Sequence, residues 1–225
     1  AVDADGKTGD GAGIHLEIPP DFFIEKIELT GQRNNNSKIC VGMIFLPRNN
    51  YVAQEICKTL VESELTKSNF SIYGWRQVPV NTKVLGKKAE ETRPEITQVL
   101  FKHNNKDLID KNLERKLYES RRKIENEANK VLLEGFYICS LSSKSIIYKG
   151  MFLAESIADF YIDLMDERFI SRYIIFHQRF STNTFPSWSL AQPFRSLAHN
   201  GEINTFKGNI NWMKVHEQEM SSQLF

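Results

Sequence analysis

The stretch KICVGMIFL, residues 38–46, decides the fold class. After Lys38 it contains only apolar residues and one glycine, which is typical of a strand buried on both faces. The next segment, residues 52–65, places Ile56, Leu60 and Val61 at the spacing of one helix face. A buried strand followed by an amphipathic helix indicates a fold that mixes the two kinds of element.

The rest of the chain continues this mixture. Further strands are predicted at residues 14–18, 70–80, 96–101, 136–141, 145–148 and 173–180. Further helices are predicted at residues 107–130, 154–165 and 204–220. Only a short polar turn separates the strands at 136–141 and 145–148, so the two are expected to form a hairpin. The irregular order predicts one α+β domain with helices packed on largely antiparallel sheets.

Composition narrows the class of partner. The 225 residues carry a net charge of +1, with 41% hydrophobic and 25% charged residues, which is ordinary for a globular protein. Such a balanced charge gives no support to nucleic acid or an anionic membrane as partner. No apolar run approaches the length of a membrane span. We therefore predict neither a nucleic-acid partner nor a membrane association.

The cysteines favour neither a disulfide framework nor a metal site. Cys40, Cys57 and Cys139 are odd in number and lack C-x-x-C spacing, so no structural zinc site is predicted and a reducing compartment is the default. Cys40 and Cys139 lie in apolar, strand-like runs, where a small buried side chain is expected.

The chain opens with AVDADGKTGDGAG, which has no initiator Met and resembles neither a signal peptide nor a transit peptide. This start predicts a processed or truncated chain. The glycine-rich TGDGAG, residues 8–13, lacks the Lys-Ser/Thr of a phosphate loop and precedes a strand that Pro19 and Pro20 end. A tight turn leading into a sheet is therefore predicted.

Arg179 stands out in HQRFSTN, residues 177–183, because it follows an otherwise apolar strand. A planar guanidinium at the end of a strand suits bidentate capture of a carboxylate. A structural ion pair is the alternative, and the motif taken alone leaves it open.

The tetrapeptide HNGE, residues 199–202, offers two adjacent hydrogen-bond donors. The side-chain amide of Asn200 and the backbone N–H of Gly201 can form an oxyanion hole for acyl transfer. The alternative is a simple turn, because Asn and Gly both tolerate positive φ. His199 is interpreted as a structural histidine, since no Ser or Cys stands beside it.

The two motifs together carry a resemblance. HQRFSTNTFPSWSLAQPFRSLAHNGEINTFKGNINWM, residues 177–213, closely resembles the glutaminase domain of glutamate synthases, which are class II glutamine amidotransferases. TGDGAGI, YGWRQVPV, LERKLYESRRKIE and IYKGMFLAE are similar to the same family in the same order. The resemblance implies an αββα sandwich like that of N-terminal-nucleophile (Ntn) hydrolases. It also implies that Arg179 binds the α-carboxylate of L-glutamine and that Asn200 and Gly201 form the oxyanion hole.

One departure from the family pattern matters. The family's nucleophile is a cysteine at the mature N-terminus, whereas position 1 here is Ala1. In the family TGDGAG lies well downstream of that cysteine, and the acidic residue for the substrate ammonium group lies beyond HNGE, past Phe225. Residues 1–225 are therefore expected to be a partial glutaminase domain without its nucleophile segment and its C-terminal part, and inactive alone.

The resemblance also implies the activity of a parent protein. The parent would hydrolyse L-glutamine and use the ammonia to aminate 2-oxoglutarate, with FMN and a 3Fe–4S cluster outside this chain. Its electron donor would be ferredoxin or NAD(P)H. Abundant Lys, Ile and Asn, as in NNNSK, suit an AT-rich plastid genome, which slightly favours ferredoxin and the plastid stroma over NAD(P)H and the cytoplasm. HQRF and FPSW are at least as typical of the pyridine-nucleotide enzymes.

This function has two rivals. The first is another class II amidotransferase, such as one for glucosamine or purine synthesis, and GNINWM and QPFR argue against it. A non-catalytic glutamine-binding domain that lost its cysteine is the second rival.

Overall fold

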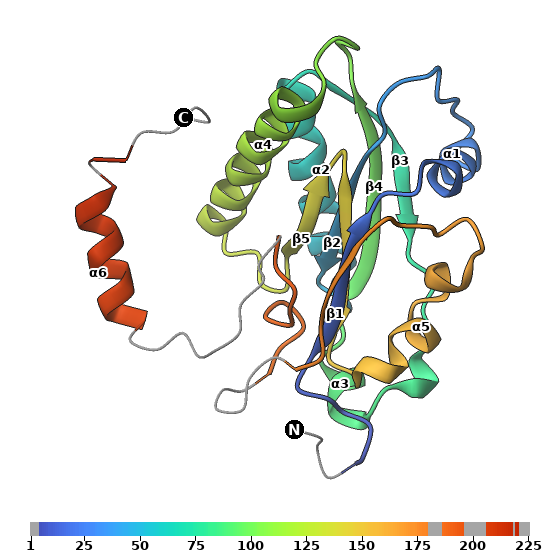
Figure 1. Cartoon of the computed structure of the whole chain (residues 1–225), viewed down its shortest axis with the longest axis vertical. Coiled ribbons are helices and arrows are strands. Elements are labelled where there is room, and N and C mark those ends of the chain that lie inside the picture. Colours follow the sequence, from blue (N-terminus) through green and yellow to red (C-terminus); the bar gives the residue numbers. More distant parts are fainter. Residues whose placement is uncertain (1–4, 180–185, 196–205, 218, 221–225) are drawn as a thin grey trace.

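The computed structural model of the chain describes residues 5–179, 186–195, 206–217, 219 and 220 (Figure 1). Its strands are β1 (Ala12–Glu17), β2 (Cys40–Leu46), β3 (Phe70–Gln77), β4 (Glu95–His103), β5 (Tyr137–Ser142), β6 (Ser145–Gly150) and β7 (Ile174–His177). Its α-helices are α1 (Pro20–Glu28), α2 (Tyr51–Lys67), α3 (Lys87–Glu91), α4 (Asp110–Lys130), α5 (Ile157–Phe160) and α6 (Phe206–His216). Short 3₁₀ helices are η1 (Thr82–Val84), η2 (Ala154–Ser156) and η3 (Ile162–Met165).

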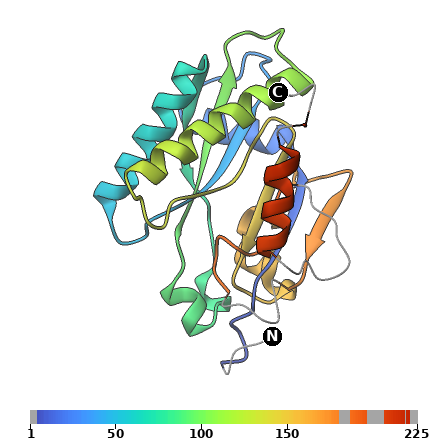
Figure 2. The same cartoon turned by 90° about the vertical axis from the view of Figure 1, so that its left-hand side faces the viewer.

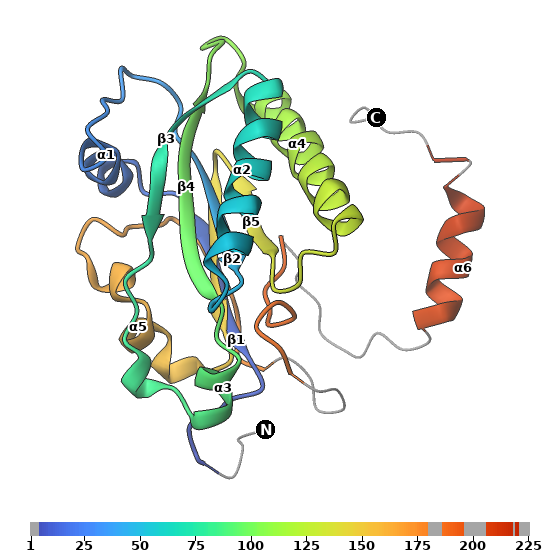
Figure 3. The same ribbon diagram turned by 180° about the vertical axis from the view of Figure 1, so that it is seen from behind.

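The strands form two antiparallel sheets. One has the order β3-β4-β2-β5 and the other the order β6-β1-β7. Figure 2 shows helices α2 and α4 on one side of the four-stranded sheet and the three-stranded sheet on the other, and Figure 3 shows the two helices side by side from behind. The predicted α+β class with largely antiparallel sheets is confirmed.

Strand β2 is buried on both faces, as the stretch KICVGMIFL predicts. Val41, Met43 and Phe45 point into the core between the two sheets. The alternate residues, Ile44 and Leu46 among them, point into the core between the four-stranded sheet and the helices. Because side chains alternate along a strand, an unbroken apolar run can supply two cores at once.

Helix α4 covers the sheet with a narrow apolar stripe. Leu113, Leu117 and Ile124 are fully buried, and their spacing places them on one face of the helix. They meet Val61 and Leu65 of helix α2 in the core that faces β2. The long helix predicted at residues 107–130 is thus confirmed, and most of its charges face solvent, whereas Arg121 is buried and pairs with Glu125 at 2.7 Å.

Helix α1 corrects the sequence prediction, in which Pro19 and Pro20 only end a strand. Pro20 is the first residue of the helix, where a proline loses no hydrogen bond and its fixed φ suits helical geometry. Phe22, Phe23 and Ile27 are buried on one face. The apolar residues at this helical spacing were the signal that the sequence interpretation missed.

The predicted hairpin of residues 136–148 is wrong. Strand β5 pairs with β2, whereas β6 pairs with β1 in the other sheet. The turn between them is fixed by helix α4, since the backbone N–H and the hydroxyl of Ser143 both donate to Glu114 Oε1 at 2.7 Å. The chain therefore crosses from one sheet to the other at this point.

The helix predicted at residues 154–165 is interrupted. Tyr161 between α5 and η3 has an extended backbone, with φ −94° and ψ 96°, and forms an isolated bridge with Val80. Its hydroxyl donates to the carbonyl of Lys149 at 2.7 Å. These contacts with distant segments outweigh the local helical preference at this position.

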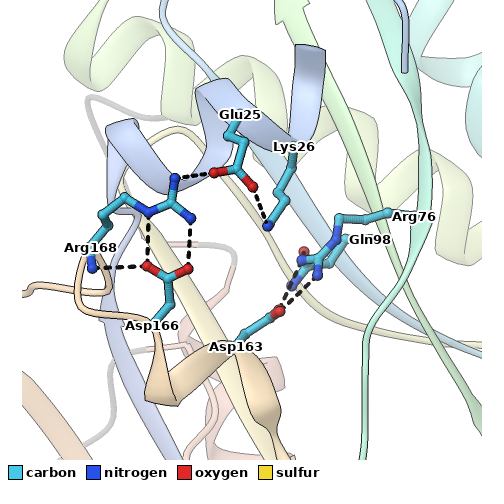
Figure 4. Close-up of polar contacts among 7 residues, drawn as sticks. All are labelled: Glu25, Lys26, Arg76, Gln98, Asp163, Asp166 and Arg168. Atoms are coloured by element: carbon cyan, nitrogen blue, oxygen red, sulfur yellow. Dashed lines mark hydrogen bonds and ion pairs between the residues drawn. The ribbon is translucent and has the colours of Figure 1, made fainter. Parts of the chain in front are cut away.

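A buried polar network joins the two sheets near α5 and η3 (Figure 4). Arg76 Nη1 and Nη2 donate to both carboxylate oxygens of Asp163 at 2.8 and 2.7 Å. Tyr148 of β6 donates to the same carboxylate at 3.0 Å, and Gln98 of β4 donates to the Tyr148 hydroxyl at 3.0 Å. Every member has a partner, so the network can join the layers without leaving a buried charge unpaired.

A second polar cluster in Figure 4 ties helix α1 to the segment after η3. Arg168 donates to both oxygens of Asp166 at 2.8 and 2.7 Å and also to Glu25 of α1. These hydrogen bonds hold the pKa values of Asp166 and Glu25 well below the ordinary carboxyl range. The helix that the sequence interpretation missed is thus attached by charge as well as by apolar burial.

No helix among the described residues is both long enough and apolar enough to cross a bilayer.

Candidate active site

Three of the motif segments meet at one pocket. A cavity of about 1220 Å³ lies between β1, β7 and the segment at residues 152–157. Asp10 from TGDGAG, Phe152 from the KGMFLAE segment and Arg179 from HQRF all line it. Segments far apart in the sequence therefore form one concave surface, which is where a small-molecule site is expected.

The pocket combines an apolar floor with charged groups. Ile14, Phe152 and Phe176 supply apolar surface, while Asp10 and Arg179 supply opposite charges. Phe176 is largely exposed for so large an apolar side chain. A ligand with a carboxylate at one end and a short aliphatic chain would match this pattern.

Arg179 lies two residues after the end of β7 and leaves most of its side chain in solvent. The side chain is 58% exposed, and its Nε lies 3.7 Å from Oδ2 of Asp10. That single long contact is the one ion pair of Arg179 among the described residues. The guanidinium is therefore held in place without its fork being saturated, and it can still accept a second carboxylate.

His177 helps to orient Arg179, which lies two residues after it. The backbone N–H of Arg179 donates to His177 Nδ1 at 3.2 Å, which requires that nitrogen to be unprotonated. Burial lowers the pKa of His177, and the nearby Asp10 carboxylate opposes the shift only in part. At neutral pH the cation at the pocket mouth is therefore Arg179.

The segment TGDGAG is a turn into a strand, as predicted. Gly11 has φ +117°, which a residue with a side chain rarely adopts, and β1 starts at Ala12. A Cβ on Gly9 would lie 2.4 Å from the carbonyl oxygen of Phe152. Both glycines thus let the backbone place Asp10 in the pocket wall, a role that the interpretation of TGDGAG as a simple turn missed.

The two predicted oxyanion-hole residues, Asn200 and Gly201, lie outside the described residues. Their role stays a prediction. The carboxylate-binding role of Arg179 also stays a prediction, although the structure places the residue at the pocket.

The cysteines of the chain do not fit a nucleophile. Cys40, Cys57 and Cys139 are all buried. Burial raises the pKa of Cys57 to about 11 and that of Cys139 to about 12, and it raises the pKa of Cys40 still further. A reactive cysteine needs the opposite shift and access to substrate.

The same thiols do not fit an iron–sulfur cluster. Cys40 and Cys57 lie in the core between helices and sheet, whereas Cys139 lies in the core between the sheets. Among the residues with described placement, no group of three or more His, Cys, Asp or Glu could hold a metal ion.

Comparison with known proteins identifies the family of the chain. Residues 1–225 match the family described as "Glutamine amidotransferases class-II". The chain belongs to this family. The resemblance noted from its motifs is thereby confirmed, and the arginine at the pocket lies in a class II amidotransferase.

Three relatives indicate the branch of the family. The chain is 56% identical over 225 residues to "Glutamate synthase [NADPH] large chain" of Azospirillum brasilense, covering 100% of this chain and 15% of that protein. It is 43% identical over 224 residues to "Ferredoxin-dependent glutamate synthase 1, chloroplastic/mitochondrial" of Arabidopsis thaliana, covering 99% and 14%. It is 42% identical over 225 residues to "Ferredoxin-dependent glutamate synthase, chloroplastic" of Spinacia oleracea, also covering 99% and 14%. The chain thus spans about one seventh of the length of these relatives.

Proposed function

We propose that residues 1–225 are part of the glutaminase domain of a glutamate synthase. In this proposal the chain supplies the carboxylate-binding arginine and the oxyanion hole, and the nucleophile comes from elsewhere in the longer protein. The observation that carries the proposal is the pocket with Arg179 at its mouth, built from three motif segments of a chain 56% identical throughout to a glutamate synthase.

Glutamine binds first through its α-carboxylate. Two N–H groups of the Arg179 guanidinium donate to the two carboxylate oxygens, an arrangement that a lysine cannot reproduce. Asp10 lies 3.7 Å from Nε, so it orients the guanidinium while leaving the fork open. The aliphatic carbons of glutamine pack on the apolar floor, including Ile14 and Phe176.

A cysteine thiolate outside this chain then attacks the side-chain amide carbon of glutamine. The new C–S bond converts the carbonyl into a tetrahedral oxyanion, and Asn200 and Gly201 donate to that oxygen. Collapse of the oxyanion breaks the C–N bond, and the protonated nitrogen leaves as ammonia. Water hydrolyses the resulting thioester to glutamate and free thiol. Each donor of an oxyanion hole typically lowers the barrier by about 2.7–4 kcal/mol.

The ammonia would aminate 2-oxoglutarate at a second site, and two electrons and protons would reduce the product to L-glutamate. FMN and a 3Fe–4S cluster would supply the electron transfer from parts of the longer protein outside these residues. Because the three cysteines of this chain do not fit the nucleophile, we expect residues 1–225 alone to release no ammonia from glutamine above a heat-killed control.

The electron donor and the compartment both stay predictions. The slight preference for ferredoxin as electron donor is not confirmed. The relative whose name includes NADPH is 56% identical to the chain, whereas the two relatives named ferredoxin-dependent are 43% and 42% identical. Two relatives carry "chloroplastic" in their names, which agrees with a plastid location, but the NADPH-named relative is more similar. Activity assays of the longer protein with reduced ferredoxin and with NADPH separate the two donors.

The rival functions make different predictions. Another class II amidotransferase would share the glutaminase chemistry but deliver ammonia to an acceptor other than 2-oxoglutarate. A non-catalytic glutamine-binding domain would bind glutamine and release no ammonia even in the longer protein. The chain is 56% and 43% identical to two proteins named glutamate synthase, and this similarity supports the glutamate synthase proposal over both rivals.

The test is Arg179→Lys in the longer protein. This change keeps the charge but removes the planar fork, so kcat/KM for glutamine should fall by roughly 100-fold, as expected for loss of a bidentate charged contact. Glutamate synthesis from free ammonia should be unchanged. Arg115→Lys is the matched control, since Arg115 is a partly exposed arginine paired with Glu119 on helix α4. Equal losses with both ammonia sources would show that Arg179 is structural.

A further inference from the structure

Two strands of the fold end in the same way. Strand β7 ends at His177, whose Nδ1 accepts the backbone N–H of Arg179 at 3.2 Å. Strand β4 ends at His103, whose Nδ1 accepts the backbone N–H of Asn105 at 3.1 Å. In each case a side chain binds the N–H two residues later, as Asn and Asp do in an Asx turn. The contact therefore fixes the direction in which the chain leaves the strand.

The two histidines have different surroundings. His177 lines the pocket of about 1220 Å³ together with Asp10 and Arg179. His103 does not line that pocket, and its ring packs edge-to-face on Phe70 with 4.9 Å between the ring centroids. The same local contact thus occurs at the proposed glutamine site and also away from it, so the chain contains its own control.

The hydrogen bond at the pocket matters because Arg179 lies beyond the sheet. The pairing of β7 with β1 ends at His177, two residues before Arg179. The contact of Arg179 Nε with Asp10 Oδ2 measures 3.7 Å, which is too long for a hydrogen bond. Attraction over that distance draws the guanidinium toward Asp10 but does not fix the backbone from which it extends. The bond to His177 Nδ1 does fix that backbone.

Burial and the charges around His177 leave its ring neutral. Burial lowers the pKa of His177, and the Asp10 carboxylate opposes this shift only in part. Arg179 and Glu155 line the same pocket, and Gly13, the partner of His177 in β1, brings no charge to it. At neutral pH Nδ1 therefore carries a lone pair that can accept the N–H of Arg179.

We propose that His177 is a positioning residue of the glutamine site, whose Nδ1 fixes the backbone of Arg179 so that the guanidinium meets the α-carboxylate of the substrate. This inference rests on the proposed function of Arg179. His177 itself need not touch glutamine. The α-carboxylate keeps its charge throughout the reaction, so the contact with Arg179 is equally strong in the ground state and in the transition state. Loss of its alignment should therefore raise KM for glutamine and leave kcat unchanged.

The experiment compares three substitutions of His177 in the longer protein by steady-state kinetics. His177→Leu removes the acceptor, so KM for glutamine should rise by roughly 3- to 10-fold, as expected for the loss of one hydrogen bond. Its kcat should stay within about twofold of wild type, and ammonia-dependent synthesis should be unchanged. His177→Asn keeps an acceptor at the position of Nδ1, so its KM should stay within about twofold of wild type. His177→Gln places its acceptor one bond further out, near the position of Nε2, and should behave like His177→Leu.

His103→Leu is the matched control. It removes the same kind of hydrogen bond at the end of β4, so it should lower the unfolding temperature about as much as His177→Leu and leave KM and kcat at their wild-type values. A purely structural His177 would give this same pattern, and a KM within about twofold of wild type in His177→Leu would overturn the proposal. If His177→Leu does not fold, the other two variants decide, because equal KM values for His177→Asn and His177→Gln contradict a role of Nδ1.

A double variant separates this inference from the proposed function. If His177 acts through Arg179, adding His177→Leu to Arg179→Lys should raise KM by less than about twofold further, because the planar fork is already lost. A further rise as large as in the wild-type background would show that His177 acts independently of Arg179. If Arg179→Lys lowers kcat/KM for glutamine while His177→Leu leaves KM unchanged, only the positioning role fails. If Arg179→Lys has no effect on kcat/KM, the proposed function of Arg179 fails as well.

Discussion

Arg76 and Arg179 each face an aspartate, but in opposite surroundings. The Arg76–Asp163 pair is closed: the side chains are 13% and 2% exposed, and their shortest contact is 2.7 Å. The Arg179–Asp10 pair is open, because the Arg179 side chain is 58% exposed and its contact with Asp10 measures 3.7 Å. A saturated, buried fork joins two layers of the fold, whereas an exposed and unsaturated fork can still bind a ligand. The difference lies in burial and geometry and not in residue type.

The largest expected effect tests the closed pair. Arg76→Met leaves the carboxylate of Asp163 buried without its cation, so the free energy of unfolding of the chain should fall by about 3–5 kcal/mol. Arg179→Met is the matched change at the open pair and should alter stability by less than about 0.5 kcal/mol. Urea unfolding of both variants at pH 7 makes the comparison. If the two variants lost similar amounts of unfolding free energy, the closed and the open pair would not differ in their contribution to stability.

The next effect tests whether Asn200 of HNGE is catalytic. Asn200→Asp replaces an amide donor by a carboxylate that faces the developing oxyanion, so glutamine-dependent kcat of the longer protein should drop by at least roughly 10²–10³. Glutamine affinity and thermal stability should change little, because the charge develops mainly in the transition state.

Asn105→Asp is the control for that variant. Asn105 Oδ1 accepts a hydrogen bond from the backbone N–H of Asp107 in an exposed loop, and an aspartate can accept the same bond. Its kcat should match the wild type. A stable Asn200→Asp protein with near-normal kcat would leave HNGE as a turn only.

The smallest effect concerns Lys149 of β6, a buried cation for which no carboxylate partner is present within the described part of the chain. Burial lowers its folded-state pKa from 10.5 to about 8. Between these values the unfolded chain binds one more proton, so stability should rise with pH, by about 1.4 kcal/mol per unit relative to Lys149→Met. Below about pH 8 the difference should be constant. Urea unfolding of both proteins from pH 7 to 10 measures it, and a flat difference across that range contradicts the shifted pKa.

Local patterns predicted the elements whose burial is periodic. The run KICVGMIFL became β2, and the stripe through Leu113 and Leu117 became helix α4. Patterns failed where distant contacts decide the conformation. Tyr161 interrupts a helix because it pairs with Val80, and β5 and β6 separate into two sheets because their partners are β2 and β1.

The sequence by itself determined which chemistry is available: a guanidinium in HQRF, an amide and a backbone N–H in HNGE, and the family to which these motifs belong. Only the tertiary structure showed that Asp10 faces Arg179, that Lys149 reaches Ser189, and that the three cysteines are enclosed in cores. Periodicity reports which side of an element is buried, because that depends on spacing along the chain. It does not report which distant residue lies opposite, because strand pairing and layer packing select that partner.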